Sequence, residues 1–314
     1  PHVQRRHAFY RTRSHCAGIG YAGAIDCPVV ARTTVDCAFR LTTCVMQLNK
    51  SQLEDFDRDG FLFFPDLFDT KEIGILLSEV KRLARINANS IVREGNEQTP
   101  KILMQVHETD SATASEAFRQ LACSPRALGL ARQVLRDDAL YLHHSKINMK
   151  AAIEGSTWPW HQDFMSWKLD GIARPDMVTV LVMLHEATPM NGCLYFVPGT
   201  HRLNRLDPRY DTSTAYQFWA ADTATMREVM AKHADPVAIT GRAGSAVVFH
   251  CNLLHASGHN LSPFDRWHAF LSFNTVANQP HKVDNPRPEY VRSTNWTPLI
   301  LGADQPIVES VAPA

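Results

Sequence analysis

The stretch from Thr157 to Trp167 places an imidazole and a carboxylate two residues apart, at His161 and Asp163. In an extended strand, residues i and i+2 point to the same face, so both side chains would project together while Gln162 points away. A neutral imidazole beside a carboxylate can bind a divalent metal when a third ligand comes from elsewhere in the chain. Because four large aromatic rings also lie in this stretch, we place the chemistry here.

His255 is the candidate for the third ligand. It ends an apolar segment that begins at Phe249, and small residues follow it, so the backbone could approach a bound ligand closely there. Two histidines and one carboxylate leave three octahedral positions open, the arrangement used by non-haem Fe(II) oxygenases. A second His-x-Asp pair, His233 and Asp235, falls at an expected helix end before Pro236, and we interpret it as a solvated turn.

Arg266 follows His255 by eleven residues and enters an expected strand from Trp267 to Phe273. Its planar guanidinium can hold a carboxylate through two parallel hydrogen bonds, which suits the distal carboxylate of 2-oxoglutarate. Taken singly, each histidine could be a hydrogen-bonded core residue and Arg266 a surface ion pair. The His-x-Asp pair, the distant histidine and the arginine together are much more specific than any one of them.

Composition limits the class of protein. The chain has 314 residues with 45% apolar content, enough for one large domain or two small ones. Lys plus Arg equals Asp plus Glu at 32 each, so no global field favours nucleic acid or a membrane as partner. No apolar run approaches the roughly 18 residues needed to span a bilayer. We expect a cytoplasmic protein in which Cys123, Cys193 and Cys251 are reduced core thiols.

Residues 1–45 differ from the rest of the chain. They hold four of the seven cysteines and six Arg against two Asp, with no Lys or Glu and no convincing apolar period. We expect an atypical N-terminal extension that is disordered or not native, followed by one domain over residues 46–314. A transit peptide is an alternative. A zinc site made by the four cysteines is another, although their spacing contains no CxxC pair.

Helices are expected first and strands later. A capping box at Ser51–Glu54 predicts a helix that stops at Gly60. Apolar residues spaced by three and four predict a helix over 70–88, and further helices are expected within 115–138 and over 222–233. Residues 87–100 are polar and read as an irregular loop. Strands are expected at 61–65, 141–150, 177–185, 193–197, 244–250 and 269–274. This order favours a helix-buttressed β-sandwich or jelly roll.

Several short motifs in the chain resemble those of a known enzyme family. From Phe56 to about Leu299 it is similar to the phytanoyl-CoA hydroxylase superfamily of Fe(II)/2-oxoglutarate dioxygenases. Its motifs are nearest to those of bacterial proline trans-4-hydroxylases and, less closely, ectoine hydroxylases. The motifs are Lys146-Ile-Asn-Met-Lys150, Trp158-Pro-Trp-His-Gln-Asp-Phe164, Asp170-Gly171, Glu186-Ala-Thr188, Asn191-Gly192 and Phe196-Val-Pro-Gly-Thr-His201.

The resemblance implies a fold, cofactors and a set of site residues. The fold would be mainly β with flanking helices, a double-stranded β-helix of the cupin-like jelly-roll type. Fe(II) would be the metal, with 2-oxoglutarate and O2 as cosubstrates. Iron is assigned to His161, Asp163 and His255. For 2-oxoglutarate the resemblance assigns Arg266, helped by Asn148, Thr179 and Ser257, with Trp158 as a wall. Candidate substrate contacts are Trp167, His143 and Lys146, although His143 could equally be structural.

The expected reaction is hydroxylation of a small polar molecule. The chain keeps Asp163 where the related halogenases have a small residue, which favours hydroxylation. Our first choice of substrate is a free amino or imino acid such as proline. The chain departs from the proline enzymes at His144-Ser145, at Cys193–Tyr195 and over Tyr210–Trp219, so ectoine, an aminophosphonate or a natural-product scaffold is the alternative. An alternative of another class is a non-catalytic metal-binding module.

Overall fold

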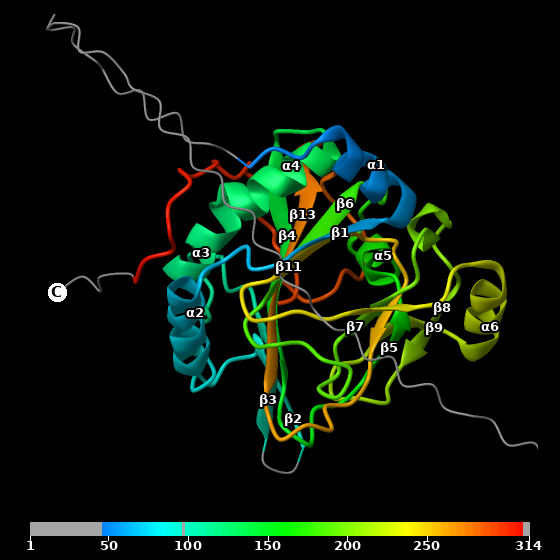
Figure 1. Cartoon of the computed structure of the whole chain (residues 1–314), viewed down its shortest axis with the longest axis horizontal. Coiled ribbons are helices and arrows are strands. Elements are labelled where there is room, and N and C mark those ends of the chain that lie inside the picture. The colour runs from blue at the N-terminus through cyan, green and yellow to red at the C-terminus, as the bar shows by residue number, and fades with distance from the viewer. Residues whose placement is uncertain (1–45, 96–97, 310–314) are drawn as a thin grey trace, which may run out of the picture. The chain divides into compact units, whose positions relative to one another are not determined.

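Helices precede most of the strands along the chain, as predicted (Figure 1). The computed structural model describes residues 46–95 and 98–309, so the prediction for residues 1–45 lies outside the described residues. The helices are α1 (Lys50–Asp59), α2 (Thr70–Leu83), α3 (Glu116–Cys123), α4 (Leu130–Leu135), α5 (Asp163–Trp167) and α6 (Thr223–Lys232), with short turns η1 (Pro125–Gly129), η2 (Lys168–Asp170), η3 (Thr200–Arg202) and η4 (Val276–Asn278). The strands are β1 (Phe61–Phe64), β2 (Ile91–Glu94), β3 (Thr99–Met104), β4 (Leu140–Lys150), β5 (Trp158–His161), β6 (Met177–Met183), β7 (Leu194–Phe196), β8 (Pro208–Asp211), β9 (Phe218–Ala221), β10 (Val237–Ile239), β11 (Ala246–His250), β12 (His255–Ser257) and β13 (Arg266–Thr275).

Two antiparallel sheets form the body of the fold. The large sheet has seven strands in the order β1-β11-β6-β13-β4-β3-β2, and the small sheet has four in the order β10-β7-β12-β5. Strands β8 and β9 pair with each other in a separate hairpin. Two facing antiparallel sheets with helices on the outside make the predicted jelly roll.

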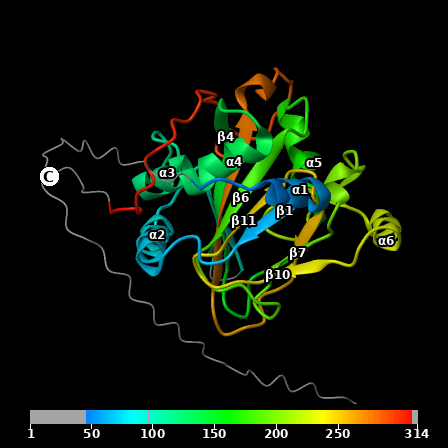
Figure 2. The same cartoon turned by 45° about the horizontal axis from the view of Figure 1, so that its top comes forward.

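The large sheet has a hydrophobic core on each face. Helices α2, α3 and α4 cover one face, and they gather on the same side of the sheet in both views (Figures 1 and 2). The other face packs on the small sheet. Within β6, Val180 and Val182 contact the helix side, whereas Leu181 and Met183 pack with Phe196 of the small sheet. Burial on both faces explains the nearly continuous apolar run of this strand.

The first two helices begin at capping boxes. Asn49 accepts a hydrogen bond from Gln52 N at 2.9 Å, and the Gln52 side chain accepts one from Asn49 N at 3.0 Å. The box predicted to start at Ser51 is therefore wrong by two residues. Gly60 ends α1 with φ of 85°, as predicted. Among the described residues, no helix is long and apolar enough to cross a bilayer.

Residues 87–100 were predicted to form an irregular loop, and this prediction is wrong. Helix α2 ends at Leu83, and the segment then supplies β2 and the start of β3, which extend the large sheet beyond β4. Lys101 Nζ lies 2.6 Å from Glu94 Oε2, and both side chains are largely buried. Glu94, one of the polar residues that suggested a loop, is therefore compensated by Lys101 inside the fold.

Candidate active site

The two residues of the His-x-Asp pair lie on either side of a strand-to-helix junction. Strand β5 ends at His161 and helix α5 begins at Asp163, so the single strand assumed from the sequence is wrong. Gln162 between them keeps an extended backbone, with φ of −104° and ψ of 133°. Its side chain turns away and binds backbone groups, accepting from Leu206 N at 2.9 Å and donating to Asn252 O at 3.0 Å. The predicted alternation of the three side chains holds.

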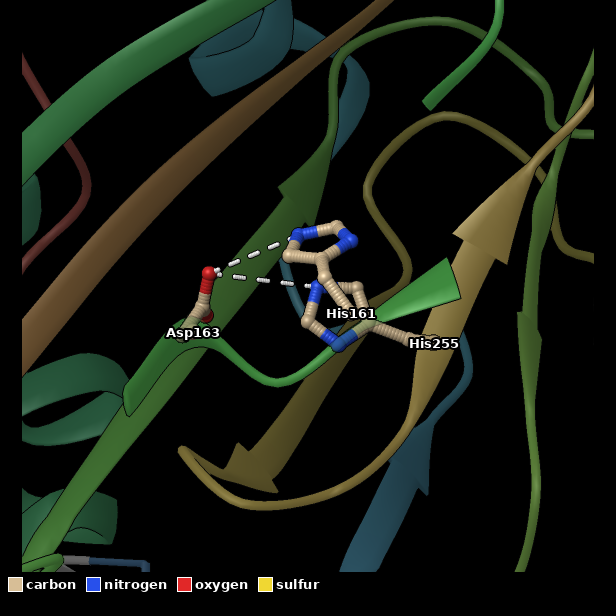
Figure 3. A group of neighbouring side chains, drawn as sticks. All are labelled: His161, Asp163 and His255. Carbon is tan, nitrogen blue, oxygen red and sulfur yellow. Dashed lines mark ion pairs between the residues drawn. The ribbon is translucent and has the colours of Figure 1, made fainter. Parts of the chain in front are cut away.

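His255 completes the cluster from the neighbouring strand. It begins β12, which pairs with β5 so that His255 stands directly opposite His161. Figure 3 shows both imidazoles turned toward Asp163. The Nε2 atoms of His161 and His255 lie 3.8 and 3.9 Å from Asp163 Oδ1, and one donor atom from each residue lies within 4.8 Å of the others. In the described part of the chain, this is the one group of three such side chains placed to hold a metal.

Local backbone contacts set the tautomer of both histidines. His161 Nδ1 lies 2.8 Å from Pro159 O, and His255 Nδ1 lies 2.9 Å from Leu253 O. A carbonyl only accepts, so each Nδ1 carries the hydrogen and each Nε2 presents a lone pair toward Asp163. Burial lowers the pKa of both imidazoles below the ordinary value. Two neutral nitrogens and one carboxylate, with no further protein ligand, fit ferrous iron with open positions.

The second His-x-Asp pair is not part of any such cluster. His233 is the residue at which α6 ends, and Asp235 is exposed to solvent. This agrees with the interpretation of that pair as a solvated turn. Identical spacing therefore has a different meaning in the two places.

Arg266 is a buried cation without an anion. It begins β13 and is only 1% exposed, and no carboxylate among the described residues lies within ion-pair distance of it. Its Nη2 donates to Gly192 O at 2.8 Å, while its buried Nε has no partner. Burial lowers its pKa to about 9, so it stays charged at neutral pH. An uncompensated buried guanidinium fits the carboxylate of a ligand.

Arg266 and the three-residue cluster border the same cavity. Its walls come from β4, β5, β7, β12 and β13, together with the first residue of α5. The lining residues are Lys146, Asn148, Trp158, His161, Asp163, Leu194, His255, Ala256, Ser257, Arg266 and Phe270. Asn148 Oδ1 is a further buried atom without a hydrogen-bond partner. The carboxylate of a small dicarboxylate would meet an unsatisfied donor at Arg266 Nε.

Some predicted site residues lie outside this cavity. Thr179 Oγ1 is 2.9 Å from Ser272 Oγ and does not line the cavity. Trp167 packs in an apolar cluster around Phe164, and its ring lies 5.8 Å from that of His143. Of the three candidate substrate contacts, only Lys146 lines the cavity, with Nζ 5.2 Å from the ring centres of Trp158 and Phe270.

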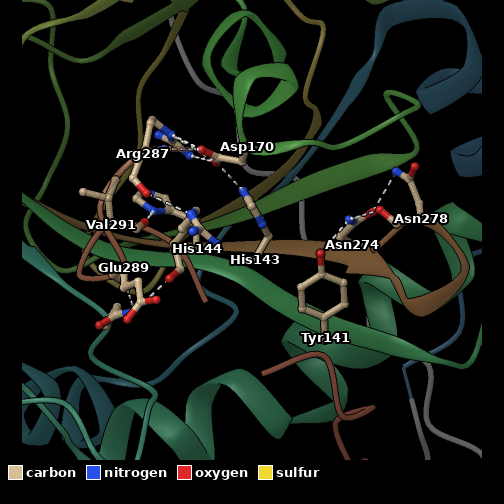
Figure 4. A network of polar contacts seen from close by, with 11 residues as sticks. Tyr141, His143, His144, Asp170, Asn274, Asn278, Arg287, Glu289 and Val291 are labelled. Atoms are coloured by element: carbon tan, nitrogen blue, oxygen red, sulfur yellow. Dashed lines mark hydrogen bonds and ion pairs between the residues drawn. The ribbon is translucent and has the colours of Figure 1, made fainter. Parts of the chain in front are cut away.

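Asp170, Arg287 and His143 form a buried polar network that sequence analysis missed (Figure 4). Arg287 Nη2 lies 2.5 Å from Asp170 Oδ2, and His143 Nε2 lies 3.0 Å from the same oxygen. Burial alone would raise the pKa of Asp170, but Arg287 and His143 hold it below the ordinary value. His144 also hydrogen-bonds Val291 O, so this part of the C-terminal segment is fastened to β4. Arg287 stands in an irregular, proline-containing stretch, where no periodicity or motif pointed to it.

An aromatic wall beside His161 was also missed. Phe218 of β9 lies with its ring centre 4.8 Å from that of His161 and 5.4 Å from that of Trp158. Strands β8 and β9 had not been expected, although Phe218 falls within Tyr210–Trp219, one of the stretches where the chain departs from the proline enzymes. The predicted core thiols are free, with Cys193 and Cys251 buried and Cys123 partly exposed.

Comparison with known proteins agrees with this geometry. The phytanoyl-CoA dioxygenase (PhyH) family matches residues 56–267, a range that includes the three-residue cluster and Arg266. The chain belongs to this family. Crystal structures of EctD from Sphingopyxis alaskensis hold Fe in one case and 2-oxoglutarate in another, and the predicted enzyme class and cofactors are confirmed.

Curated members of the family match over most of the chain. An ectoine dioxygenase of Nocardia farcinica is 34% identical over 267 residues, covering 81% of this chain and 88% of its own length. One from Sphingopyxis alaskensis is 32% identical over 280 residues, covering 84% of this chain and 89% of its own length.

Solved structures support the fold. A crystal structure of EctD from S. alaskensis with 2-oxoglutarate and 5-hydroxyectoine has a TM-score of 0.72 at 30% identity, covering 83% of this chain and 89% of that one. The carbocyclase SnoK from nogalamycin biosynthesis has a TM-score of 0.61 at 18% identity, which supports the fold alone.

Proposed function

We propose that this protein hydroxylates ectoine or a closely similar small zwitterion. The observation that carries the proposal is the extent of similarity to ectoine dioxygenases, 34% identity over 81% of the chain in one case. These relatives favour the alternative substrate over the first choice, and they do not support proline. Family membership likewise does not support a non-catalytic metal-binding module.

In this proposal His161, Asp163 and His255 hold Fe(II). Their free Nε2 atoms and carboxylate already face one another, so metal binding needs no change of tautomer. Bound iron supplies the activation of dioxygen that couples the oxidation of 2-oxoglutarate to hydroxylation of a C–H bond. Three ligands from the chain leave room for both oxygen and 2-oxoglutarate.

Arg266 would hold the distal carboxylate of 2-oxoglutarate at the far end of the cavity. Nε has no partner in the fold, and Nη2 has only Gly192 O, so the guanidinium can make charge-assisted hydrogen bonds to a carboxylate. Asn148, Ser257 and Trp158 line the same space and would orient the cosubstrate. The buried side chains around the cavity would keep the oxidant from side reactions.

A substrate panel tests the proposed activity. Purified protein with Fe(II), 2-oxoglutarate and O2 would be given ectoine, proline, other amino acids or aminophosphonates in turn. We expect ectoine to give the largest increase in succinate formation, with one CO2 released and one product heavier by one oxygen atom for each 2-oxoglutarate consumed. Greater stimulation by proline or an aminophosphonate, with ectoine inactive, would overturn the proposed substrate.

A further inference from the structure

Lys150 is a buried amine that the proposed reaction does not use. It ends β4, is 1% exposed and stands directly opposite Arg266 in the pairing of β4 with β13. Its Nζ donates to Ser156 O at 2.7 Å and also to Gly258 O. No carboxylate among the described residues lies within ion-pair distance of this nitrogen. Lys150 therefore binds backbone carbonyls rather than a counter-ion.

The two carbonyls belong to the segments that carry the cavity walls. Ser156 lies just before Trp158, which begins β5, and Gly258 directly follows Ser257, which ends β12. Both Trp158 and Ser257 line the cavity beside Arg266. One side chain thus joins β4 to the two segments around the guanidinium.

A third segment interlocks with them at Gly192. Its carbonyl accepts the hydrogen bond from Arg266 Nη2. A Cβ at this position would lie 2.6 Å from Gly258 O and 3.2 Å from Lys150 Cδ, and its φ of +77° favours glycine. The residue whose carbonyl orients Arg266 is therefore packed against the carbonyl held by Lys150.

The number of N–H donors on the Lys150 amine matches the number of carbonyl acceptors around it. Burial, followed by the charges of Arg266 and Lys101, lowers its pKa to about 5, so the amine is neutral at pH 7. Glu94 is engaged by Lys101 instead. A neutral amine has two N–H donors, and Lys150 has two carbonyl acceptors. It braces the site without adding a second positive charge beside Arg266.

We propose that Lys150 is a positioning residue for 2-oxoglutarate, which fixes the walls of the Arg266 end of the cavity by binding Ser156 O and Gly258 O. The inference rests on the proposed role of Arg266 as the carboxylate clamp. It does not depend on the identity of the primary substrate.

Equilibrium binding of 2-oxoglutarate to the Mn(II)-loaded protein, measured by calorimetric titration without primary substrate, tests this proposal. Lys150→Met removes both donors and has a side chain one bond shorter than that of lysine. Lys150→Gln keeps two N–H donors on a neutral group but is shorter by one bond. Arg126→Met is the matched control, since it breaks the buried pair with Glu72 on the helix side of the large sheet. Thermal melting is recorded for each variant.

We expect Lys150→Met to raise the Kd of 2-oxoglutarate by about tenfold or more, because a misplaced site loses binding geometry. Lys150→Gln should raise it by a smaller factor. Arg126→Met should lower the melting temperature and leave the Kd unchanged. An unchanged Kd in Lys150→Met overturns the proposal, as does equal weakening by Arg126→Met. If Lys150→Met does not fold, an unchanged Kd in Lys150→Gln overturns it.

Arg266→Gln distinguishes the role of Lys150 from the proposed role of Arg266 in binding the carboxylate of 2-oxoglutarate. If Arg266→Gln binds 2-oxoglutarate like the wild type, the clamp is misassigned and the role of Lys150 falls with it. If Arg266→Gln weakens binding while the Lys150 variants do not, only the positioning role is wrong.

Discussion

A histidine can bind a metal only if one ring nitrogen is unprotonated and points toward the metal site. Backbone contacts orient two histidines in this way. His161 and His255 each use Nδ1 to bind the carbonyl two residues earlier, at Pro159 and Leu253. The same local contact therefore orients two imidazoles on neighbouring strands. Burial keeps both neutral, which a metal ligand requires.

Asp163→Ala should abolish iron binding and hydroxylation, because it removes one of the three proposed metal ligands. Metal content after dialysis, and the visible charge-transfer band on anaerobic addition of Fe(II) and 2-oxoglutarate, would measure the effect. Asp235→Ala removes the carboxylate of the other His-x-Asp pair and should change neither. Retention of the band in Asp163→Ala would show that the ligand set is misassigned.

Arg266→Ala should weaken the binding of 2-oxoglutarate by about 2 to 5 kcal/mol, which is the range for removing one partner of a buried charge pair. The concentration of 2-oxoglutarate needed for half-maximal turnover reports the loss. Arg242→Ala removes an exposed arginine paired with Asp66, and this control should leave that concentration unchanged. An unaltered requirement in Arg266→Ala would mean that another group holds the carboxylate.

At the scale of residues, the sequence predicts those site residues that can be recognised from their types and their spacing along the chain. The types and spacing of His161, Asp163, His255 and Arg266 indicated a site, and the fold brings all four to one cavity. Thr179 was expected there and instead hydrogen-bonds Ser272, because strand pairing decides which side chains meet. No local signal could reveal a contact made only when distant segments pack together.

At the scale of elements, prediction succeeded where apolar residues repeat. Helix α2 and strand β6 bury continuous apolar faces, and both were expected. Strands β2 and β3 were not, because their burial depends partly on Lys101 and Glu94 neutralising each other. The β8–β9 hairpin was missed as well, and most of its residues are partly or fully exposed, so it lacks a strong apolar period.

A pair of Gly→Ala variants tests how the C-terminal segment docks. Gly171 has φ of +98°, and a Cβ there would lie 2.1 Å from His281 O. Gly171→Ala should therefore lower the free energy of unfolding by at least about 1 to 3 kcal/mol. Gly74 lies exposed in α2 with nothing near its added Cβ, so Gly74→Ala should instead raise it by about 0.5 to 1 kcal/mol.

Denaturant unfolding of the two variants would measure both changes. The comparison is matched because the substitution is the same and only the backbone and surroundings differ. Equal stability of Gly171→Ala and the wild type would show that the contact between η2 and residue 281 does not help to hold the fold.

At the scale of the whole molecule, the fold class followed from the order of helices and strands, but the burial of so many polar groups did not. Histidines lie on both sides of the large sheet, and many are inside. His107 is 8% exposed, with Nδ1 2.7 Å from Ser145 Oγ. His250 accepts a hydrogen bond from Asn252 N at 3.0 Å through Nδ1, so that nitrogen is unprotonated. Such residues make the stability of the entire fold depend on pH.

Acid should therefore destabilise the protein well before its carboxylates are protonated. Burial, with a smaller effect of Arg119, lowers the pKa of His107 to about 3, and burial with His201 lowers that of His250 to about 4. The unfolded chain binds protons at these positions near pH 6.5, whereas the folded chain does not. Their stabilising contribution is complete above about pH 6.5 and is lost progressively as pH falls toward 4 and then 3.

Denaturant unfolding at pH 7.5, 6 and 5 would show this as a falling free energy of unfolding. His107→Gln replaces the imidazole by a group that does not titrate, so its stability should fall less over the same range. The difference between the two proteins isolates His107 from His161 and His255, the proposed metal ligands, since those are present in both. If the two curves run parallel, His107 has a similar pKa in the folded and unfolded chains, and its burial does not set the acid limit of the fold.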